Sequence, residues 1–240
     1  MNLLLLDAGE VGSDGEARLE GRRLEHVRTV LKLAPGDSLR VGVVGGQLGE
    51  AKVVSIDERA LVLRCAFSEP PPPRANVSLI LAIPRPKQLK RVIPAVASLG
   101  VDRVMLVNAA RVEKSYFDSK VLNAAFLDEL IQLGLEQACD TVKPVLGVRE
   151  RLKPFIEDEL DAWLPAGATR LVPHPTGALP LKPVEARQHV AIAIGPDGGW
   201  VPFEIELFEK AGFSPVSLGR RVLRGEVAVP AVLGAVRAAT

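Results

Sequence analysis

The sequence predicts an α/β protein in which a small strand-rich domain precedes a larger domain built on a parallel sheet. Three observations carry this prediction. Short strand-like segments fill the first seventy residues, four prolines follow at Pro70–Pro73, and apolar runs then alternate with helical segments towards the C-terminus. Proline disrupts the interior of helices and sheets, and strand–helix alternation is typical of a parallel sheet covered on both faces. We therefore expect domains at residues 1–69 and 76–240, joined by a linker at 70–75.

Strands and one helix are expected in the N-terminal domain. Runs of β-branched and apolar residues alternate with turn residues and predict three strands, at residues 40–44, 50–56 and 60–65. Apolar side chains recur at helical spacing between residues 20 and 33, and Pro35-Gly36-Asp37 ends that helix. Several strands and one short helix are typical of a small β-barrel, a fold that often binds RNA.

The larger domain shows longer apolar runs. These runs predict buried strands at residues 77–83, 103–108, 169–172, 190–194 and 216–218. Helices are expected between them, at residues 88–99, 120–138, 202–211 and 227–238. Strands that are apolar throughout belong in a parallel sheet, because helices cover both of its faces.

Composition excludes some classes of protein. The 240 residues are 48% hydrophobic but only 4% aromatic, so the core must be aliphatic, and a net charge of +1 gives no global reason to bind nucleic acid. Cys65 and Cys139 are predicted to be buried free thiols of a reducing compartment. No signal peptide and no apolar run of about 18 residues is present, so we expect a cytoplasmic protein. The histidines lack metal-ligand spacing, so no metal is expected.

Two glycine-containing loops near the C-terminus are the most informative motifs. Gly195-Pro196-Asp197-Gly198-Gly199 follows an apolar strand and precedes a helix, and the run Leu218–Glu226 follows the next strand. Glycine lets a ligand approach the backbone closely. Apolar neighbours and free backbone N–H groups suit an adenine and a ribose better than a phosphate. The alternative for the first loop is a plain strand-to-helix turn.

The two motifs together resemble the cofactor site of the SPOUT methyltransferases, and more closely that of the ribosomal RNA small subunit methyltransferase E family. That family carries Gly-Pro-Glu-Gly-Gly and then Leu-Gly-x-Arg-Ile-Leu-Arg-x-Glu-Thr-Ala. The run Glu25–Lys32 with Pro35-Gly36-Asp37 resembles its N-terminal motif. The resemblance implies S-adenosylmethionine-dependent methylation of N3 of a uridine in small-subunit (16S) ribosomal RNA. It also implies a PUA-like N-terminal barrel, a C-terminal trefoil knot and a homodimer, and the apolar last helix agrees with a subunit interface.

The resemblance also implies which residues hold the cofactor. They are His174, Ile194, Gly195, Pro196, Gly198, Gly199, Leu218, Gly219, Val222, Leu223 and Arg224. His174 would form a third wall of the site, or it is an ordinary loop histidine.

Methylation at N3 of uridine requires removal of a proton and stabilisation of the resulting anion. Positive charge can hold the anion and a carboxylate can take the proton. Arg224 and Glu226 follow the second loop directly and are the catalytic candidates. A structural salt bridge is the equal alternative for both.

Two basic clusters are candidates for phosphate contacts, which position RNA without reading its sequence. The first, Arg85, Lys87, Lys90 and Arg91, includes no acidic residue. The second includes Arg22, Arg23 and Arg28, with Glu16, Glu20 and Glu25 interleaved. A solvated helix face is the alternative for each cluster, and His26 is either packed or an RNA contact.

Some positions depart from the family pattern. Ala95 and Ser98 stand where the family usually has Lys and Glu, Asp140 stands where it has Arg, and Val227 replaces Thr. These departures keep open a non-catalytic RNA-binding or ribosome-assembly factor, or a SPOUT methyltransferase with a different RNA target. A SPOUT ribose 2′-O-methyltransferase is disfavoured, because the final motif lacks the usual Asn.

Overall fold

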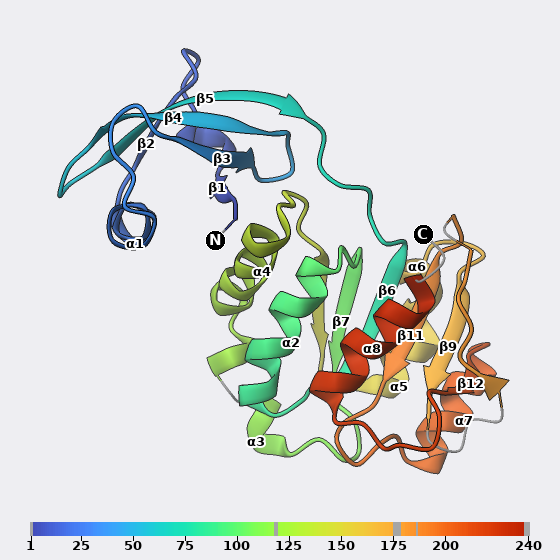
Figure 1. The fold of residues 1–240 in the computed structure, drawn as a ribbon. Helices are drawn as coiled ribbons and strands as arrows, with labels where there is room; N and C mark the ends of the chain where they lie inside the picture. The colour runs from blue at the N-terminus through green and yellow to red at the C-terminus, as the bar shows by residue number, and fades with distance from the viewer. Residues whose placement is uncertain (1, 118–119, 175–178, 186, 238–240) are drawn as a thin grey trace. The chain divides into compact units, whose positions relative to one another are not determined.

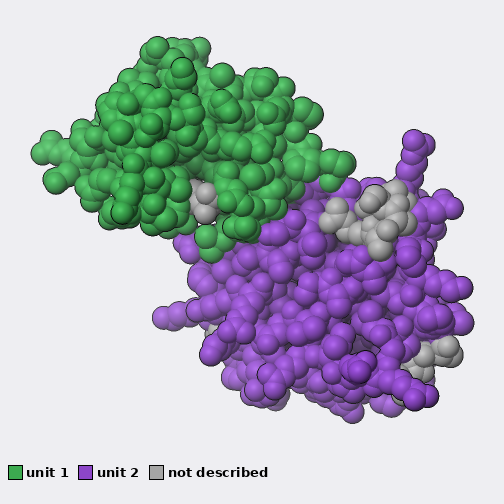
Figure 2. All heavy atoms as spheres, in the orientation of Figure 1, with its two compact units in different colours: residues 1–73, 132–143 green, residues 74–131, 144–240 purple. Residues whose placement is uncertain are grey.

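The chain forms two compact units. The computed structural model describes residues 2–117, 120–174, 179–185 and 187–237. Unit 1 comprises residues 1–73 and 132–143, and unit 2 comprises residues 74–131 and 144–240 (Figure 2). Unit 1 is therefore assembled from two pieces of the chain that lie far apart in the sequence.

Unit 1 is a curled five-stranded sheet with the order β1-β3-β4-β5-β2 (Figure 1). Its strands are β1 (Leu4–Leu6), β2 (Glu16–Leu19), β3 (Ser38–Val43), β4 (Leu48–Ile56) and β5 (Leu61–Glu69). Strands β1 and β3 pair in parallel and the other pairs are antiparallel. Over the described residues the two edge strands do not pair with each other. The expected barrel is thus a half-barrel, and β1 and β2 are additions to the predicted strands.

The core of unit 1 is aliphatic, as the composition requires. Leu6, Val27, Leu61 and Leu63 are fully buried between the sheet and a helix that starts as α1 (Gly21–His26) and continues as a π-helical turn, η2 (Val27–Leu31). A short 3-10 turn, η1 (Ala8–Glu10), precedes β2. The single helix predicted over residues 20–33 is confirmed, with an irregular second half.

The second piece of unit 1 is bonded closely to the first. The backbone N–H of Asn2 donates to the carbonyl oxygen of Glu136 at 3.2 Å, and that of Gly45 donates to Thr141 at 2.8 Å. The Thr141 hydroxyl donates to the carbonyl oxygen of Gly46 at 2.6 Å, and the Thr141 side chain is fully buried. Residues 132–143 are therefore an integral part of unit 1.

The two cysteines are free thiols, but the prediction that both are buried is wrong, since each is only partly buried. Cys65 lies on β5, where alternate side chains face the solvent, and it packs against the edge of the core. Burial still raises the pKa of the Cys65 thiol to about 11. It is therefore uncharged and unreactive at neutral pH.

Unit 2 contains a seven-stranded parallel sheet with the order β10-β12-β9-β11-β6-β7-β8. Its strands are β6 (Val77–Ala82), β7 (Arg103–Val107), β8 (Val145–Arg149), β9 (Thr169–Pro173), β10 (Leu179–Pro180), β11 (Val190–Ile194) and β12 (Ser214–Ser217). Every residue of β6 and β11 is buried, as expected for central strands covered on both faces. The predicted α/β class is confirmed.

Helices cover both faces of this sheet (Figure 1). They are α2 (Pro86–Ser98), α3 (Lys114–Phe117), α4 (Ala124–Ala138), α5 (Leu152–Pro154), α6 (Leu160–Trp163), α7 (Pro202–Lys210) and α8 (Gly225–Arg237), with short turns η3 (Lys120–Leu122) and η4 (Phe155–Glu159). Helix α8 packs against α2 and β11. Among the described residues, no helix is both long and apolar enough to cross a membrane. Because all seven strands are parallel, the loops after them gather at one edge of the sheet.

Candidate active site

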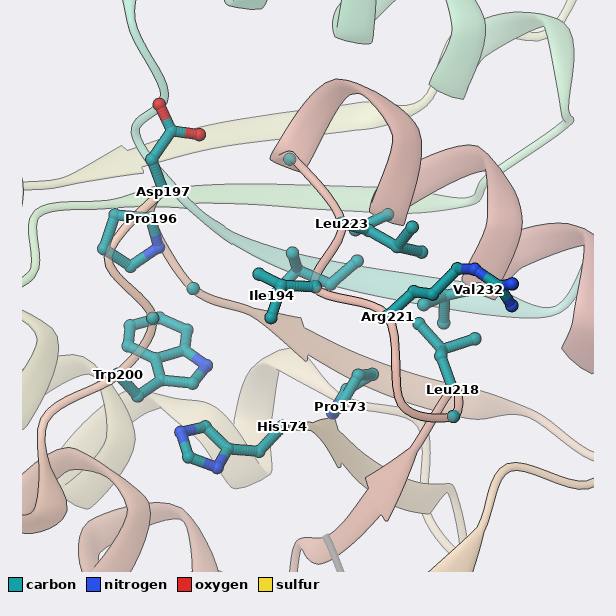
Figure 3. Close-up of a pocket in the computed structure, with 16 residues that line it drawn as sticks. Pro173, His174, Ile194, Pro196, Asp197, Trp200, Leu218, Arg221, Leu223 and Val232 are labelled. Atoms are coloured by element: carbon teal, nitrogen blue, oxygen red, sulfur yellow. The ribbon is translucent and has the colours of Figure 1, made fainter. Parts of the chain in front are cut away.

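A pocket of about 110 Å³ lies at this carboxyl edge of the sheet (Figure 3). Three loops and a helix form it: the end of β9 with His174, the loop 194–200 after β11, the loop 218–223 after β12, and the first turns of α8. Ligands of open α/β sheets bind in crevices outside the carboxyl ends of the strands. The position is therefore the one that the fold makes available for a ligand.

Nine of the eleven residues predicted for the cofactor line this pocket. They are His174, Ile194, Gly195, Pro196, Gly199, Leu218, Gly219, Val222 and Leu223. Gly198 and Arg224 belong to the same loops but do not line it. Segments that are far apart in the sequence thus converge as predicted, while their contact with a cofactor stays a prediction.

The sequence reasoning missed several lining residues. They are Pro173, Asp197, Trp200, Arg221, Gly225, Ala228 and Val232. Ala228 and Val232 are four residues apart on α8, so helical spacing places them on one face. Trp200 directly follows the first glycine loop, and its ring packs on Phe208 with 4.9 Å between centroids. Three of these residues, Asp197, Arg221 and Gly225, lie inside the two motifs, and attention to the flanks of each motif would have found the others.

The glycines shape the two loops in different ways. A Cβ at Gly195 would lie 3.0 Å from the backbone nitrogen of Trp200, so the loop folds back too tightly for a side chain there. Gly199 has φ +71° and donates its N–H to Pro196 at 2.7 Å. Gly219 has φ +106°, but a Cβ there would meet nothing within 4 Å. At Gly219 the requirement is therefore backbone conformation rather than crowding.

Two residues outside the pocket hold the first loop in place. The buried Glu204 carboxylate on α7 accepts the N–H of Ala110 at 2.8 Å and that of Val201 at 2.9 Å. Arg111 donates a hydrogen bond to the Gly198 carbonyl oxygen. The loop after β7 is thereby fastened to the loop after β11.

His174 is uncharged at neutral pH. Burial, and to a smaller extent the positive charge of Arg111, lower the pKa of this imidazole below its ordinary value. The wall of the pocket formed by His174 therefore presents a neutral ring to a ligand.

The catalytic candidates lie at the start of α8. The Arg224 carbonyl oxygen accepts the N–H groups of Val227 and Ala228, which begins the helix. The Glu226 carboxylate lies 3.5 Å from the Arg91 guanidinium on α2. An ion pair therefore accounts for Glu226, and its role as a base stays a prediction.

The basic cluster at the start of α2 includes no acidic residue in its sequence, but in the folded chain it has acidic neighbours. Arg85 lies 3.4 Å from Asp197, and Arg91 pairs with Glu226 as described. The Lys90 ammonium lies 5.3 Å from the centre of the Phe126 ring, within cation–π distance. The acidic partners come from segments that follow other strands, so reading residues 85–91 alone could not find them.

The N-terminal cluster is paired in the same way. Arg23, with a side chain 19% exposed, bonds both oxygens of Glu10 and the carbonyl oxygen of Leu5. Arg28 pairs with Glu25 at 2.8 Å, and Arg22 lies 3.8 Å from the buried Glu136. The guanidinium of Arg23 is thus used within unit 1, which weakens the prediction that it contacts RNA.

His26, beside this cluster, is half-buried. Its Nε2 is buried with no hydrogen-bond partner among the described residues, and burial lowers the pKa of its ring. The described residues also hold no group of three or more histidine, cysteine or carboxylate side chains placed to bind a metal ion.

Residues 70–237 match the family described as the RNA methyltransferase domain, so this chain is an RNA methyltransferase. The chain is 32% identical over 250 residues to the ribosomal RNA small subunit methyltransferase E of Treponema pallidum, covering 99% of this chain and 91% of that protein. It belongs to the ribosomal RNA small subunit methyltransferase E family. The Mycobacterium tuberculosis protein of the same name is 28% identical over 92% of this chain and 85% of its own length.

Solved structures agree with this assignment. The ribosomal RNA small subunit methyltransferase E of Neisseria gonorrhoeae, bound to S-adenosyl methionine, superposes with a TM-score of 0.80 at 21% identity, covering 99% of this chain and 97% of that one. The putative methyltransferase Lpg2936 of Legionella pneumophila, in complex with the same cofactor, gives 0.77 at 25% identity over 99% and 97%. The resemblance inferred from the two motifs is confirmed.

Proposed function

We propose that this protein transfers the methyl group of S-adenosylmethionine to small-subunit ribosomal RNA. The observation that carries the proposal is the convergence of both glycine loops and His174 on one pocket. The names of the relatives and the cofactor bound in the Neisseria and Legionella structures support the substrate and the cofactor.

The pocket fits this cofactor in its chemistry. Ile194, Leu218 and Leu223 offer apolar surface to an adenine ring, and the neutral His174 puts no positive charge beside a sulfonium. When bound, S-adenosylmethionine supplies an electrophilic methyl group on that sulfonium. At about 110 Å³ the pocket is smaller than the roughly 300–1,000 Å³ of most ligand sites. We therefore expect the lining to move outward on binding.

We further propose N3 of a uridine as the methylated atom, on the strength of the family motifs. Arg91 and Glu226 form an ion pair beside the start of α8, near the pocket residue Gly225. In this role Arg91 holds the negative charge that develops on the base, and Glu226 takes the N3 proton. Arg224, whose backbone begins α8, is the second candidate for holding that charge.

We also infer the PUA-like and trefoil-knot features of the family. Strand β12 lies beyond β9 in the sheet, yet α8, which follows β12, packs on α2, which follows β6. The chain after β12 must therefore pass back across the loops that follow β9 and β11 to reach α2, and such a crossing supports the knot. The curled sheet of unit 1 supports a PUA-like RNA-binding domain at residues 1–69, which residues 132–143 complete, with the linker at 70–75 and catalysis in the rest of 76–240.

We propose that RNA contacts come from the two basic clusters and that two chains form a homodimer in the cytoplasm, where ribosomal RNA is modified. Among the clusters, Lys87 is exposed and makes no ion pair with a described residue.

For the dimer, most apolar residues of α8 are covered within unit 2, so they are not an interface. Val222 and Val227 are 81% and 48% exposed and offer the apolar surface instead.

Two measurements test the proposed activity. Calorimetry should detect S-adenosylmethionine binding to the purified protein. Mapping of modified nucleotides should find one uridine of small-subunit ribosomal RNA methylated only in cells that carry the gene. A non-catalytic assembly factor would leave the modification pattern the same in both strains. A different methylated RNA would keep the enzyme class and change its target.

A further inference from the structure

A second pocket, of about 520 Å³, opens at the same edge of the parallel sheet. It lies between the loop after β7, the segment after β8 and the first turn of α7. Its lining includes Asn108, Arg151, Lys153, Phe203 and Glu204, and we call it the Phe203 pocket. Its volume falls within the roughly 300–1,000 Å³ of small-molecule sites.

Phe203 is the feature that calls for an explanation. Its side chain is 56% exposed, and no other aromatic residue is exposed anywhere in the described ranges. It is the second residue of α7, whose buried face consists of Glu204, Leu207 and Phe208. The helix therefore does not need Phe203 for its packing, and the ring stays available at the surface of the pocket.

The charge at the rim is positive. Arg151 and Lys153 are both exposed, and Arg151 makes no ion pair within the described part of the chain. Lys153 lies 3.8 Å from Glu157, a half-exposed pair that costs little to break. The acidic member of the lining, Glu204, is buried and already accepts two backbone N–H groups. An anionic ligand therefore meets two cations and no accessible carboxylate of the lining.

This combination suits one nucleotide of a single-stranded RNA. Exposed aromatic rings stack on unpaired bases, and adjacent cations contact the phosphates. The Asn108 amide can both donate to and accept from a base edge. A nucleotide supplies a flat ring, hydrogen-bonding edges and a negative charge together.

The Phe203 pocket is also joined to the proposed methyl-transfer site. Glu204, in its wall, fastens Ala110 to Val201, and Val201 directly follows the pocket residue Trp200. Arg111, next to Ala110, bonds the Gly198 carbonyl oxygen. A nucleotide bound here would lie beside the loop that we assign to the cofactor.

We propose that the Phe203 pocket binds a nucleotide of the substrate RNA that flanks the methylated one, with its base stacked on Phe203 and its phosphate held by Arg151 and Lys153. The proposal rests on the proposed function for its substrate. It explains how a site built around one base gains contacts with the neighbouring sequence.

The test uses the full-length protein and a short fluorescein-labelled oligouridylate. Phe203→Ala should weaken RNA binding roughly tenfold, within the range of one lost base–aromatic stack. Phe203→Trp should bind as well as wild type, because it keeps an aromatic face. Arg151→Ala with Lys153→Ala should weaken binding and reduce its salt dependence. The matched control, Lys182→Ala with Arg187→Ala, removes the same charge from exposed residues outside the pocket and should leave binding unchanged.

Cofactor affinity and melting temperature, measured on the same variants, should stay at wild-type values. Unchanged RNA affinity in Phe203→Ala would overturn the proposal and leave the pocket to another partner. An equal loss in the control pair would also overturn it, because any surface cation would then suffice. If the wild type bound no S-adenosylmethionine but still bound RNA through Phe203, the proposed function would fail while the RNA pocket stood.

Discussion

At the scale of single residues, Gly219 has a backbone conformation that favours glycine. Its φ of +106° is one that side chains rarely adopt, and it lines the proposed cofactor pocket. Gly219→Val should therefore distort the 218–223 loop and weaken S-adenosylmethionine binding at least tenfold in calorimetry. Gly36→Val is the matched control, because Gly36 has φ +96° and equally open space but lies in unit 1. Equal cofactor affinity in the two variants would remove Gly219 from the site.

His174 makes the proposed cofactor site sensitive to pH. Its pKa is lowered by burial and by Arg111, so the folded protein keeps the ring neutral above its ordinary value of 6.5. Once the pH falls below this lowered pKa the ring of the folded protein gains a charge, which repels the sulfonium. The folded state loses stability between pH 6.5 and that pKa, because the unfolded chain takes up the proton first. Cofactor affinity should be flat above pH 6.5 and fall as the pH drops below the lowered pKa. His174→Gln should flatten this profile in calorimetry, and a profile that still falls would assign the effect to another group.

At the scale of elements, the buried Glu204 links α7 to the loop after β7. Glu204→Ala removes the acceptor of two backbone N–H groups and should cost about 1–3 kcal/mol of unfolding free energy. Because the same loops carry Arg111 and Gly198, cofactor affinity should fall as well. Glu206→Ala, at an exposed position of the same helix, is the control for urea unfolding and calorimetry. A loss of stability without a loss of affinity would limit Glu204 to folding.

Helices and strands could be predicted where their burial shows in the sequence as a continuous or periodic run of apolar residues. Strand β11 was predicted with its observed bounds because all five of its residues are apolar and buried. Strand β1 has three residues and pairs in parallel with β3, which only the folded chain brings near. Strand β8 lies at the sheet edge and none of its residues is fully buried, and Gly147 and Arg149 interrupt the apolar run that a central strand shows.

The same distinction applies to the site. The glycine loops could be found because each is a contiguous motif whose residues serve one turn. The pair Arg85–Asp197 joins the start of α2 to a loop, and Arg91–Glu226 joins α2 to α8. The partners are more than a hundred residues apart in the sequence, so no local pattern indicates them. Phe203 was hidden for a different reason: an apolar residue in a helix is expected to face the core, and its exposure is visible only in the structure.

At the scale of the whole molecule, the proposed homodimer can be separated from the fold. Val227 lies on α8 with 48% of its surface exposed, so Val227→Glu should disrupt a dimer while leaving unit 2 folded. Val145→Glu is the control, because Val145 is 62% exposed on the edge strand β8. Light scattering at micromolar concentration should give a dimer mass for wild type and Val145→Glu and a monomer mass for Val227→Glu. A monomeric wild type would contradict the dimer itself.

The two-piece construction of unit 1 has a consequence for biosynthesis. Thr141 is fully buried in that unit and bonded to Gly45 and Gly46, so residues 1–73 alone lack part of their interior. A ribosome adds roughly 5–20 residues per second, so several seconds separate the emergence of the first piece from that of residues 132–143. During that interval all five strands of the N-terminal sheet have been made, but the unit still lacks residues 132–143. The N-terminal unit, although translated first, can therefore reach its final form only after residues 74–131 of the other unit have been made.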